Sequence, residues 1–274
     1  MISNLAQAIA RLSAAARAFD VSRFLPLHAA GVQVGWVRRD HAERLKAWPD
    51  VFQETAGGLM LASDLADSES RSAALALVVR ALAEQGVITG WRDEQYAVME
   101  EFGKPPLFHI ERAAARFLGV TTFAAHMNGY VGSGQTCRMW LARRSATKPI
   151  DPGMLDNLVG GGIPAGASVR ETLVKEGREE AGISPELMAT AVATGSVRIL
   201  RAVPEGAQSE IIFVYDLELP PDFQPRNEDG EVAEFNLTRI DEVAKLIELG
   251  SEMTLDSSLV IMKFLMTRTP ALEE

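Results

Sequence analysis

A run of glycines followed directly by a helix rich in glutamate most constrains what this chain can fold into. The segment GGGIPAGASVRETLVKEGREEAGI extends from Gly160 to Ile183. Ser168 and Glu171 form an S-x-x-E capping box, which predicts that the helix begins near Val169. Gly182 stands where a glycine commonly ends a helix. We therefore expect a helix of about thirteen residues between these two signals.

Three glutamates share one face of this helix. Glu176, Glu179 and Glu180 are spaced i, i+3 and i+4, which places them within an arc of roughly 100°. Ionised carboxylates this close repel one another unless a cation lies between them. Hard oxygen ligands of this kind suit Mg²⁺ or Mn²⁺. An acidic run alone more often marks a solvated helix, and it is the combination of the glycine loop, the spacing of the glutamates and the C-cap that favours the metal site.

The glycines are expected to form a loop that approaches a ligand closely. Gly160, Gly161 and Gly162 have no side chains and tolerate positive φ. A glycine loop that leads into a helix N-terminus is also a suitable place for a phosphate group. The loop and the acidic helix face together predict a metal-dependent site for a phosphorylated substrate.

The same stretch resembles the Nudix box, G-x5-E-x7-R-E-U-x-E-E-x-G-U, where U is an aliphatic residue. The matching positions are Gly161, Glu176, Glu179, Glu180, Gly182 and Ile183. Three positions depart from the pattern: Ala167 replaces the first glutamate, Lys175 replaces arginine and Gly177 replaces the aliphatic residue. The resemblance implies that the later glutamates bind the metal, with the Gly160 carbonyl as a backbone ligand. In the family, the first glutamate and the arginine of the box support the geometry of the loop and helix. Because lysine lacks the planar fork of arginine, we expect the ion pair that this arginine makes inside the protein to be absent or rewired here.

The flanking segments are similar to one branch of the Nudix family, the group associated with thiamine pyrophosphokinase. The segments are Trp140–Ser145, Leu155–Asn157, Phe213–Leu217 and Asp229–Phe235. This resemblance implies a diphosphatase that converts thiamine diphosphate, or preferentially its oxidised or damaged analogues, to monophosphates. One alternative is a Nudix pyrophosphatase of ADP-sugars or dinucleotides. Another, motivated by the three departures, is a non-catalytic Nudix domain that binds a ligand and regulates another process.

Further site residues follow from their place around the box. Catalytic roles are predicted for Glu179 and Glu180 and for a carboxylate after the box, either Glu231 or, preferred, Glu234. The residues predicted to bind the substrate are Arg143, Arg144, Lys148, Gly161, Gly162 and His126. The cationic side chains of Arg143, Arg144 and Lys148 suit a diphosphate, although only one of these three is expected to touch it. Asn128 or His126 is a candidate for a pyrimidine edge. Trp140, Tyr130 and Phe235 are candidates for stacking, with the hydrophobic core as the commoner place for such residues.

Length and composition predict two domains of an ordinary soluble type. The chain has 274 residues, of which 47% are apolar and 23% charged. We expect an α/β (α+β) architecture, with a smaller N-terminal α/β domain in residues 1–120. Residues 121–274 are expected to form the Nudix α/β/α sandwich around a mixed sheet. The accessory domain either helps to close the pocket or mediates homodimerisation.

Charge, hydropathy and cysteine content exclude several classes of partner. The net charge of −10 argues against nucleic acid as a partner. The sequence contains no run of about 18 apolar residues, so we expect no membrane span. The single Cys137 permits no internal disulfide and suits a reducing cytoplasm. The first nineteen residues carry arginines and no acid, as a transit peptide does. Their apolar residues at Ile2, Leu5, Ile9, Leu12, Ala16 and Phe19 instead favour an amphipathic helix packed on the body.

Overall fold

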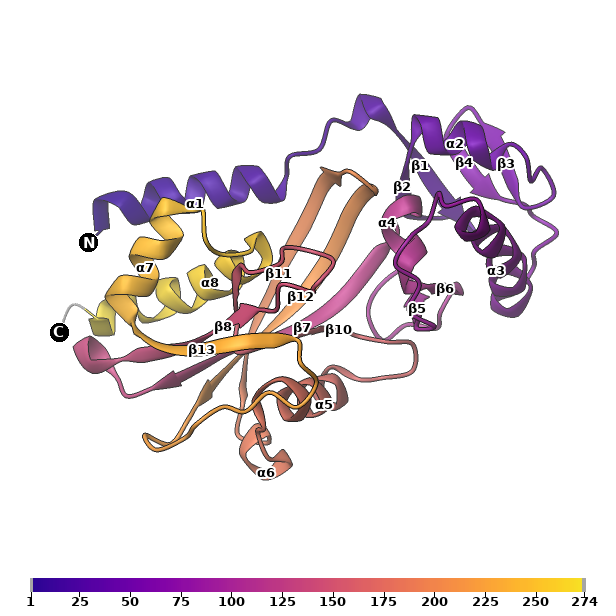
Figure 1. Ribbon diagram of the computed structural model, residues 1–274. Coiled ribbons are helices and arrows are strands. Elements are labelled where there is room, and N and C mark those ends of the chain that lie inside the picture. The colour runs from indigo at the N-terminus through magenta and orange to yellow at the C-terminus, as the bar shows by residue number, and fades with distance from the viewer. Residues whose placement is uncertain (1, 273–274) are drawn as a thin grey trace.

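The computed structural model describes residues 2–272, and side chains from residue 6 to residue 268. Two bodies lie side by side, each with its own sheet and core (Figure 1). The helices are α1 (Ile2–Ala16), α2 (Arg39–Leu45), α3 (Ser68–Glu84), α4 (Ala115–Leu118), α5 (Val169–Ala181), α6 (Pro185–Met188), α7 (Ile240–Leu249) and α8 (Leu255–Leu272). Short 3₁₀ turns are η1 (Val21–Arg23), η2 (Arg112–Ala114) and η3 (Gly134–Thr136).

The strands divide between the two bodies. The N-terminal body contains β1 (Phe24–Ala29), β2 (Val32–Arg38), β3 (Phe52–Thr55), β4 (Gly58–Leu61), β5 (Gln95–Val98) and β6 (Phe108–Glu111). The C-terminal body contains β7 (Thr121–Val131), β8 (Arg138–Arg144), β9 (Leu155–Asp156), β10 (Val159–Gly162), β11 (Val192–Val203), β12 (Gly206–Glu218) and β13 (Val232–Arg239).

The C-terminal sheet is mixed and lies between two layers of helices. Its order is β11-β12-β7-β8-β13, with β10 on β7 and β9 on β8. The β12–β7 pair is parallel and the other pairs are antiparallel. Helices α5 and α6 cover one face, and α1, α7 and α8 cover the other (Figure 1). The predicted α/β/α sandwich is confirmed.

Helix α1 packs on the C-terminal body, although it comes first in the chain. Ala8 and Leu12 belong to the core formed with α7 and α8, and Ala16 contacts the core around Ile199. The guanidinium of Arg11 donates a hydrogen bond of 2.6 Å to the carbonyl of Glu248 near the end of α7. An amphipathic helix is confirmed for the part with described side chains, and Ile2 and Leu5 lie outside it.

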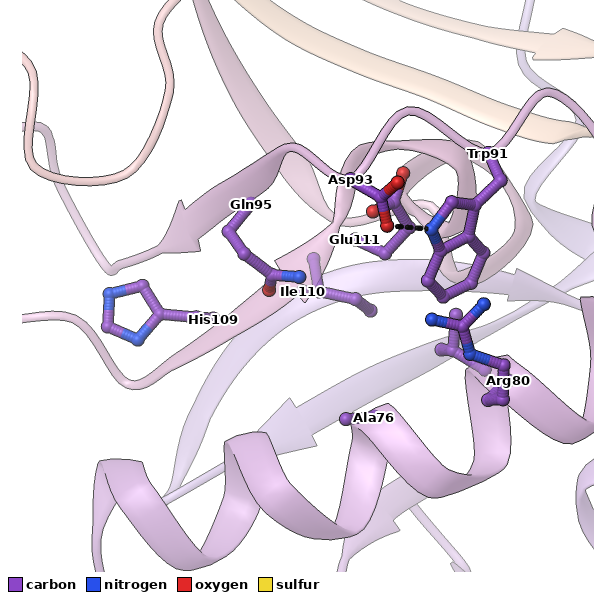
Figure 2. A pocket seen from close by; sticks show the side chains of 9 residues that line it. Ala76, Arg80, Trp91, Asp93, Gln95, His109, Ile110 and Glu111 are labelled. Carbon is purple, nitrogen blue, oxygen red and sulfur yellow. Dashed lines mark hydrogen bonds between the residues drawn. The ribbon is translucent and has the colours of Figure 1, made fainter.

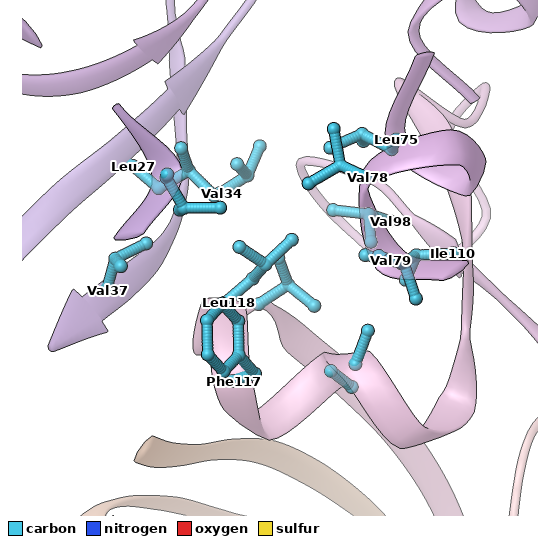
Figure 3. Close-up of a cluster of buried hydrophobic side chains, with 14 of the residues drawn as sticks. Leu27, Val34, Val37, Leu75, Val78, Val79, Val98, Ile110, Phe117 and Leu118 are labelled. Carbon is cyan, nitrogen blue, oxygen red and sulfur yellow. The ribbon is translucent and has the colours of Figure 1, made fainter. Parts of the chain in front are cut away.

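The N-terminal body has a sheet of order β2-β1-β4-β3 and a separate β5–β6 hairpin. Its core joins Leu27 and Val37 of that sheet to Leu75 and Val79 of α3 and to Phe117 of α4 (Figure 3). Burying one such side chain stabilises the fold by about 1.5–3 kcal/mol. This core is separate from the clusters that stabilise the C-terminal body.

Two predictions for the hairpin region are wrong. The sequence predicts a strand that starts at Trp91, but Asp93 has a φ of 56° and the strand starts only at Gln95. The sequence also predicts a helix over residues 110–118, but Phe108–Glu111 pairs with β5, and the helical turns begin at Arg112. Apolar runs this short fit a strand as well as a helix, and pairing with a neighbour decides between them.

Within residues 2–272, no helix combines the length and the hydropathy that crossing a membrane requires.

Candidate active site

Helix α5 begins and ends as its capping residues predict. The Ser168 hydroxyl accepts a hydrogen bond of 3.2 Å from the Glu171 backbone N–H, and the Glu171 carboxylate accepts one of 2.8 Å from the Ser168 N–H. Gly182 closes the helix with a φ of 64°. These signals fix the register of the helix, and with it the direction in which each glutamate points.

The three glycines before α5 form a strand and not a loop. Gly160, Gly161 and Gly162 pair antiparallel with His126, Ala125 and Ala124 of β7. All three lie outside the positive-φ residues, so the expected loop with left-handed backbone is wrong. Pairing with β7 satisfies the backbone groups that point toward β7, which a buried loop would leave unpaired.

The glycines are needed because other groups lie against this strand on both faces. A Cβ atom on Gly161 would lie 2.6 Å from the Glu176 carboxyl carbon, and one on Gly160 would lie 3.0 Å from the His126 ring. A Cβ atom on Gly162 would overlap the Tyr96 hydroxyl. Because the three glycines lack side chains, α5 packs closely on one face of the strand, and His126 and Tyr96 pack closely on the other.

Two of the three glutamates are withdrawn from solvent. Glu180 is 7% exposed, and its Oε2 accepts a hydrogen bond of 2.9 Å from the Gly160 N–H. Burial raises the pKa of Glu180 to about 8, and the nearby Glu176 adds to the rise. Burial also raises the pKa of Glu176, whose side chain is 18% exposed. Two adjacent buried carboxylates that are both charged destabilise the folded protein unless a cation lies beside them.

Lys175 lies between the other two carboxylates. Its amine donates to Glu176 Oε1 at 3.1 Å and to Glu179 Oε2 at 2.8 Å. The internal ion pair is thus rewired to the acidic face itself. In the described part of the chain, no group of three acidic, histidine or cysteine side chains is arranged to hold a metal ion. A cation that binds here would therefore require Lys175 to release at least one carboxylate.

A second group of charged residues faces Glu180 across a small hollow. Arg144 donates a hydrogen bond of 2.6 Å to Asp156, and Lys148 forms an ion pair with Glu231. These four residues line the hollow together with Gly160 and Glu180. The structure therefore brings together the predicted residues Arg144, Lys148 and Glu231. It adds Asp156, which sequence reasoning missed although it lies four residues before Gly160.

Arg143 and Glu234 lie on the opposite face of the sheet. Successive side chains of a strand point to opposite faces. On β8, Met139 and Leu141 pack toward α7 and α8, and Arg143 follows them with the same period. Its guanidinium pairs with Glu234 at 2.7 Å across the β8–β13 pair. The structure therefore does not bring the preferred carboxylate, Glu234, to the hollow.

His126 begins a chain of buried polar contacts. Its Nδ1 lies 2.9 Å from Asn157 Oδ1, Asn157 Nδ2 donates to Asn128 Oδ1 at 2.9 Å, and Asn128 Nδ2 donates to Asp216 at 2.9 Å. Because each amide uses its N–H₂ group toward the next acceptor, His126 Nδ1 has to donate its proton. Asn128 is fully buried and both ends of its amide are engaged, so it does not read a substrate edge.

The three candidate stacking residues belong to cores. Trp140 and Phe235 pack in the cluster beneath α5, and Tyr130 packs on the opposite face with Phe264. Packing in a core is the commoner role of aromatic residues on strands.

Comparison with known proteins identifies both halves of the chain. A family model described as the NUDIX domain matches residues 129–255, and one described as a domain of unknown function (DUF4743) matches residues 2–122. Nudix hydrolase 20, chloroplastic, of Arabidopsis thaliana is 38% identical over 254 residues, which span 89% of this chain and 68% of the relative. The chain belongs to the Nudix hydrolase family.

A second plant relative is similar over the same share of the chain. Nudix hydrolase 24, chloroplastic, of Arabidopsis thaliana is 39% identical over 247 residues, which span 89% of this chain and 68% of the relative. The crystal structure of DR0079 from Deinococcus radiodurans aligns with a TM-score of 0.48 at 18% identity, over 62% of this chain and 98% of that one. Sequence similarity therefore extends across both bodies of this Nudix hydrolase.

Nudix hydrolases generally use divalent metals such as Mg²⁺ or Mn²⁺. The residues of this chain fit such an ion in their chemistry. Glu176, Glu179 and Glu180 offer only oxygen donors, and burial of Glu176 and Glu180 makes a neutralising cation favourable.

A separate hollow of about 230 Å³ lies between α3 and the β5–β6 hairpin (Figure 2). The Arg80 guanidinium lies 3.8 Å from the centre of the Trp91 ring, and the indole N–H donates to Asp93 at 2.6 Å. One wall is formed by Glu111, whose Oε2 has no hydrogen-bond partner among the described residues. All residues that line this hollow belong to the N-terminal body.

Proposed function

We propose that this Nudix hydrolase cleaves a diphosphate through attack of water at phosphorus, and that α5 and the glycine strand hold the required divalent cation. The observation that carries the proposal is the burial of the Glu180 carboxylate against the Gly160 N–H, beside the half-buried Glu176. A chain keeps such a costly pair where a positive charge offsets it in function.

The proposed ligands are Glu176, Glu179, Glu180 and the Gly160 carbonyl. A bound divalent cation lowers the pKa of a water molecule and neutralises charge on phosphate oxygens. Glu180 is kept in one rotamer by its hydrogen bond to Gly160, so it presents a fixed donor. Lys175 pairs with both Glu176 and Glu179 in this state. When a cation binds to these carboxylates, Lys175 therefore has to leave at least one of them.

Cations across the hollow are proposed to bind the diphosphate. Lys148 and Arg144 now pair with Glu231 and Asp156, and phosphate oxygens can replace these partners because they offer the same kind of acceptor. We propose Glu231 as the carboxylate that orients the attacking water. It lines the same hollow as Glu180, whereas Glu234 points to the other face.

The finer proposal concerns the substrate. The segments around the box resemble the thiamine-associated branch, which favours oxidised or damaged thiamine diphosphate, or thiamine diphosphate itself, with the monophosphate as product. The two Arabidopsis thaliana relatives are named as Nudix hydrolases and their names give no substrate, so ADP-sugars and dinucleotides are the alternative.

One experiment tests both levels. Purified protein with Mg²⁺ is incubated separately with oxidised thiamine diphosphate, thiamine diphosphate, ADP-ribose and NADH, and the phosphorylated products are separated and counted. We expect turnover of the thiamine compounds that EDTA abolishes, with the oxidised compound preferred. Turnover of ADP-ribose with inert thiamine compounds would contradict the substrate proposal and leave the diphosphatase intact.

A matched pair of variants tests the site. Glu180→Gln keeps the shape of the side chain and removes its charge, so metal-dependent turnover should fall at least about 100-fold. Glu186→Gln makes the same chemical change on α6, where Glu186 is exposed, and should leave turnover within twofold. Equal activity of the two variants would show that the assigned site is wrong.

A further inference from the structure

A cleft of about 260 Å³ lies where the N-terminal body meets the Nudix domain. Residues from both bodies line it, among them Tyr96, Arg112 and Arg116 on one side and Gln208 and Glu210 of β12 on the other. Ile150, from the loop after β8, also lines it. Pockets for whole small ligands typically measure roughly 300–1,000 Å³, so this cleft suits one part of a larger ligand.

The cleft adjoins the proposed metal site through the glycine strand. The Tyr96 hydroxyl lies against Gly162, and the Ala165 N–H donates a hydrogen bond of 2.8 Å to the carbonyl of Gln95. Arg112 lines the cleft beside Tyr96, and the carbon at the centre of its guanidinium lies 5.7 Å from the centre of the Tyr96 ring. Glu176 lies against Gly161 on one face of this strand and Tyr96 lies against Gly162 on the other, so a ligand that reaches both the acidic face of α5 and the cleft has to pass around the glycine strand.

The N-terminal body holds its side of the cleft in a fixed geometry. Tyr96 lines the cleft and its neighbour Gln95 lines the hollow in Figure 2, as alternation along β5 requires. Arg92, before β5, and Arg112, directly after β6, also line the cleft. Glu111 Oε1 accepts hydrogen bonds of 3.0 Å from the Arg92 N–H and 3.3 Å from the Ala113 N–H. This buried carboxylate ties the segment before β5 to the turn that carries Arg112.

The floor of the cleft offers acceptors of the opposite charge. Gln208 Nε2 donates to Glu210 at 2.9 Å and to Asp256 at 3.2 Å, and its oxygen accepts from Arg201 at 2.8 Å. Of these two carboxylates, Glu210 lines the cleft, and it keeps further lone pairs for a ligand. The cleft thus pairs a cationic wall, which suits phosphate oxygens, with an acidic floor, which suits N–H groups or a cationic heterocycle.

We propose that this cleft binds the organic group of the diphosphate substrate, and that Arg112 and Tyr96 of the N-terminal body determine which group is accepted. Arg112 contacts the phosphate that stays attached to that group, and Tyr96 lies along its ring. The inference rests on the proposed diphosphatase function, and it makes the N-terminal body a working part of the active site.

Two substitutions that leave both cores untouched test the proposal. Arg112→Glu reverses the charge of a side chain that is 45% exposed. Ile150→Trp enlarges a side chain that is 41% exposed and narrows the cleft. The matched control is Arg80→Glu, which makes the same charge reversal in the same body, in the hollow away from the cleft. Circular dichroism and thermal unfolding check that all variants fold.

Steady-state kinetics are measured with the compound of the panel above that the unmodified protein hydrolyses best. We expect KM to rise at least tenfold in Arg112→Glu and Ile150→Trp, and to stay within twofold in Arg80→Glu. For Ile150→Trp, kcat should stay within threefold. Inorganic pyrophosphate, which has no organic group, should inhibit Ile150→Trp as strongly as the unmodified protein. An unchanged KM in both cleft variants would overturn the inference, as would weaker inhibition by pyrophosphate in Ile150→Trp.

Isothermal titration calorimetry of the same four compounds, with Ca²⁺ in place of Mg²⁺, separates this inference from the proposed function. If nothing is hydrolysed, the proposed function fails, and binding alone decides the inference. Binding that is lost in the cleft variants and kept in Arg80→Glu supports the cleft. Equal binding by all variants, or no binding by the unmodified protein, overturns it.

Discussion

Gly162→Ala would test how closely the N-terminal body docks on the glycine strand. Gly162 lies in β10 and outside the positive-φ residues, so alanine suits its backbone. The new Cβ would overlap the Tyr96 hydroxyl and lie 2.9 and 3.3 Å from two ring carbons. Carbon atoms in good contact are about 3.5–4.0 Å apart, so the ring has to shift. Tyr96 is only 7% exposed and sits in a core, which resists that shift.

The expected cost follows from these contacts. Overpacking of a core by one such group costs about 1–3 kcal/mol. Replacing glycine by alanine returns about 0.4–1 kcal/mol through the unfolded chain. The free energy of unfolding should therefore fall by about 1–2 kcal/mol. Tyr96→Phe removes the overlapping oxygen but keeps the two ring contacts, so it should recover part of this loss.

Urea denaturation followed by tryptophan fluorescence measures all four members of the double-mutant cycle. We expect a coupling free energy of at least about 0.5 kcal/mol between the two substitutions, as is usual for residues in contact. Gly57→Ala is the control, because the nearest atom to a Cβ there is 3.8 Å away and its φ is not positive. It should change stability by less than about 1 kcal/mol. Strictly additive effects of Gly162→Ala and Tyr96→Phe would refute the docking argument.

Three further predictions address the carboxylates and α1. Glu231→Gln should lower kcat/KM at least tenfold, because Glu231 lines the hollow. Glu234→Gln should change kcat/KM less than about threefold, because Glu234 pairs with Arg143 on the opposite face. The reverse order in a kinetic assay would make Glu234 the catalytic carboxylate. Burial raises the pKa of Asp256 to about 6 from 3.8, so its ionisation destabilises the fold increasingly as pH rises. Asp256→Asn should therefore gain about 1.4 kcal/mol in stability relative to the unmodified protein between pH 5 and pH 8; a pH-independent difference in urea unfolding would contradict the shift. Leu12→Ala should cost about 2–4 kcal/mol, because Leu12 is 6% exposed in the core with α7 and α8; a loss below about 0.5 kcal/mol would show that α1 is not part of that core.

Most of the Nudix domain could be predicted because its signals are local. The capping box at Ser168 and the glycine at Gly182 fix α5 through hydrogen bonds between neighbours in the chain. The apolar runs on either side of Pro204, with a turn signal between them, indicate two strands, and the structure has β11 and β12 there. The division near residue 120 stays a prediction, and α1, from the first side of that division, packs on the second core.

The glycines show where local reasoning fails. Gly160 and its neighbours permit a loop, and nothing nearby in the chain excludes one. Pairing with β7, more than thirty residues earlier, makes them a strand. Likewise Arg143 and Arg144 are adjacent in sequence and equally basic, and only the pleat of β8 sends one to the hollow and the other to the opposite face.

The sequence by itself determined the acidic helix, its ends and the chemistry that its carboxylates offer, because these depend on residues within about four positions of one another. The tertiary structure alone decided which charged residues face that helix. Glu231 was separated from Glu234, and Tyr96 and Arg112 were brought to the glycine strand from the other body. Contacts of this kind depend on sheet register and on the docking of two cores, which residue spacing within one segment does not encode.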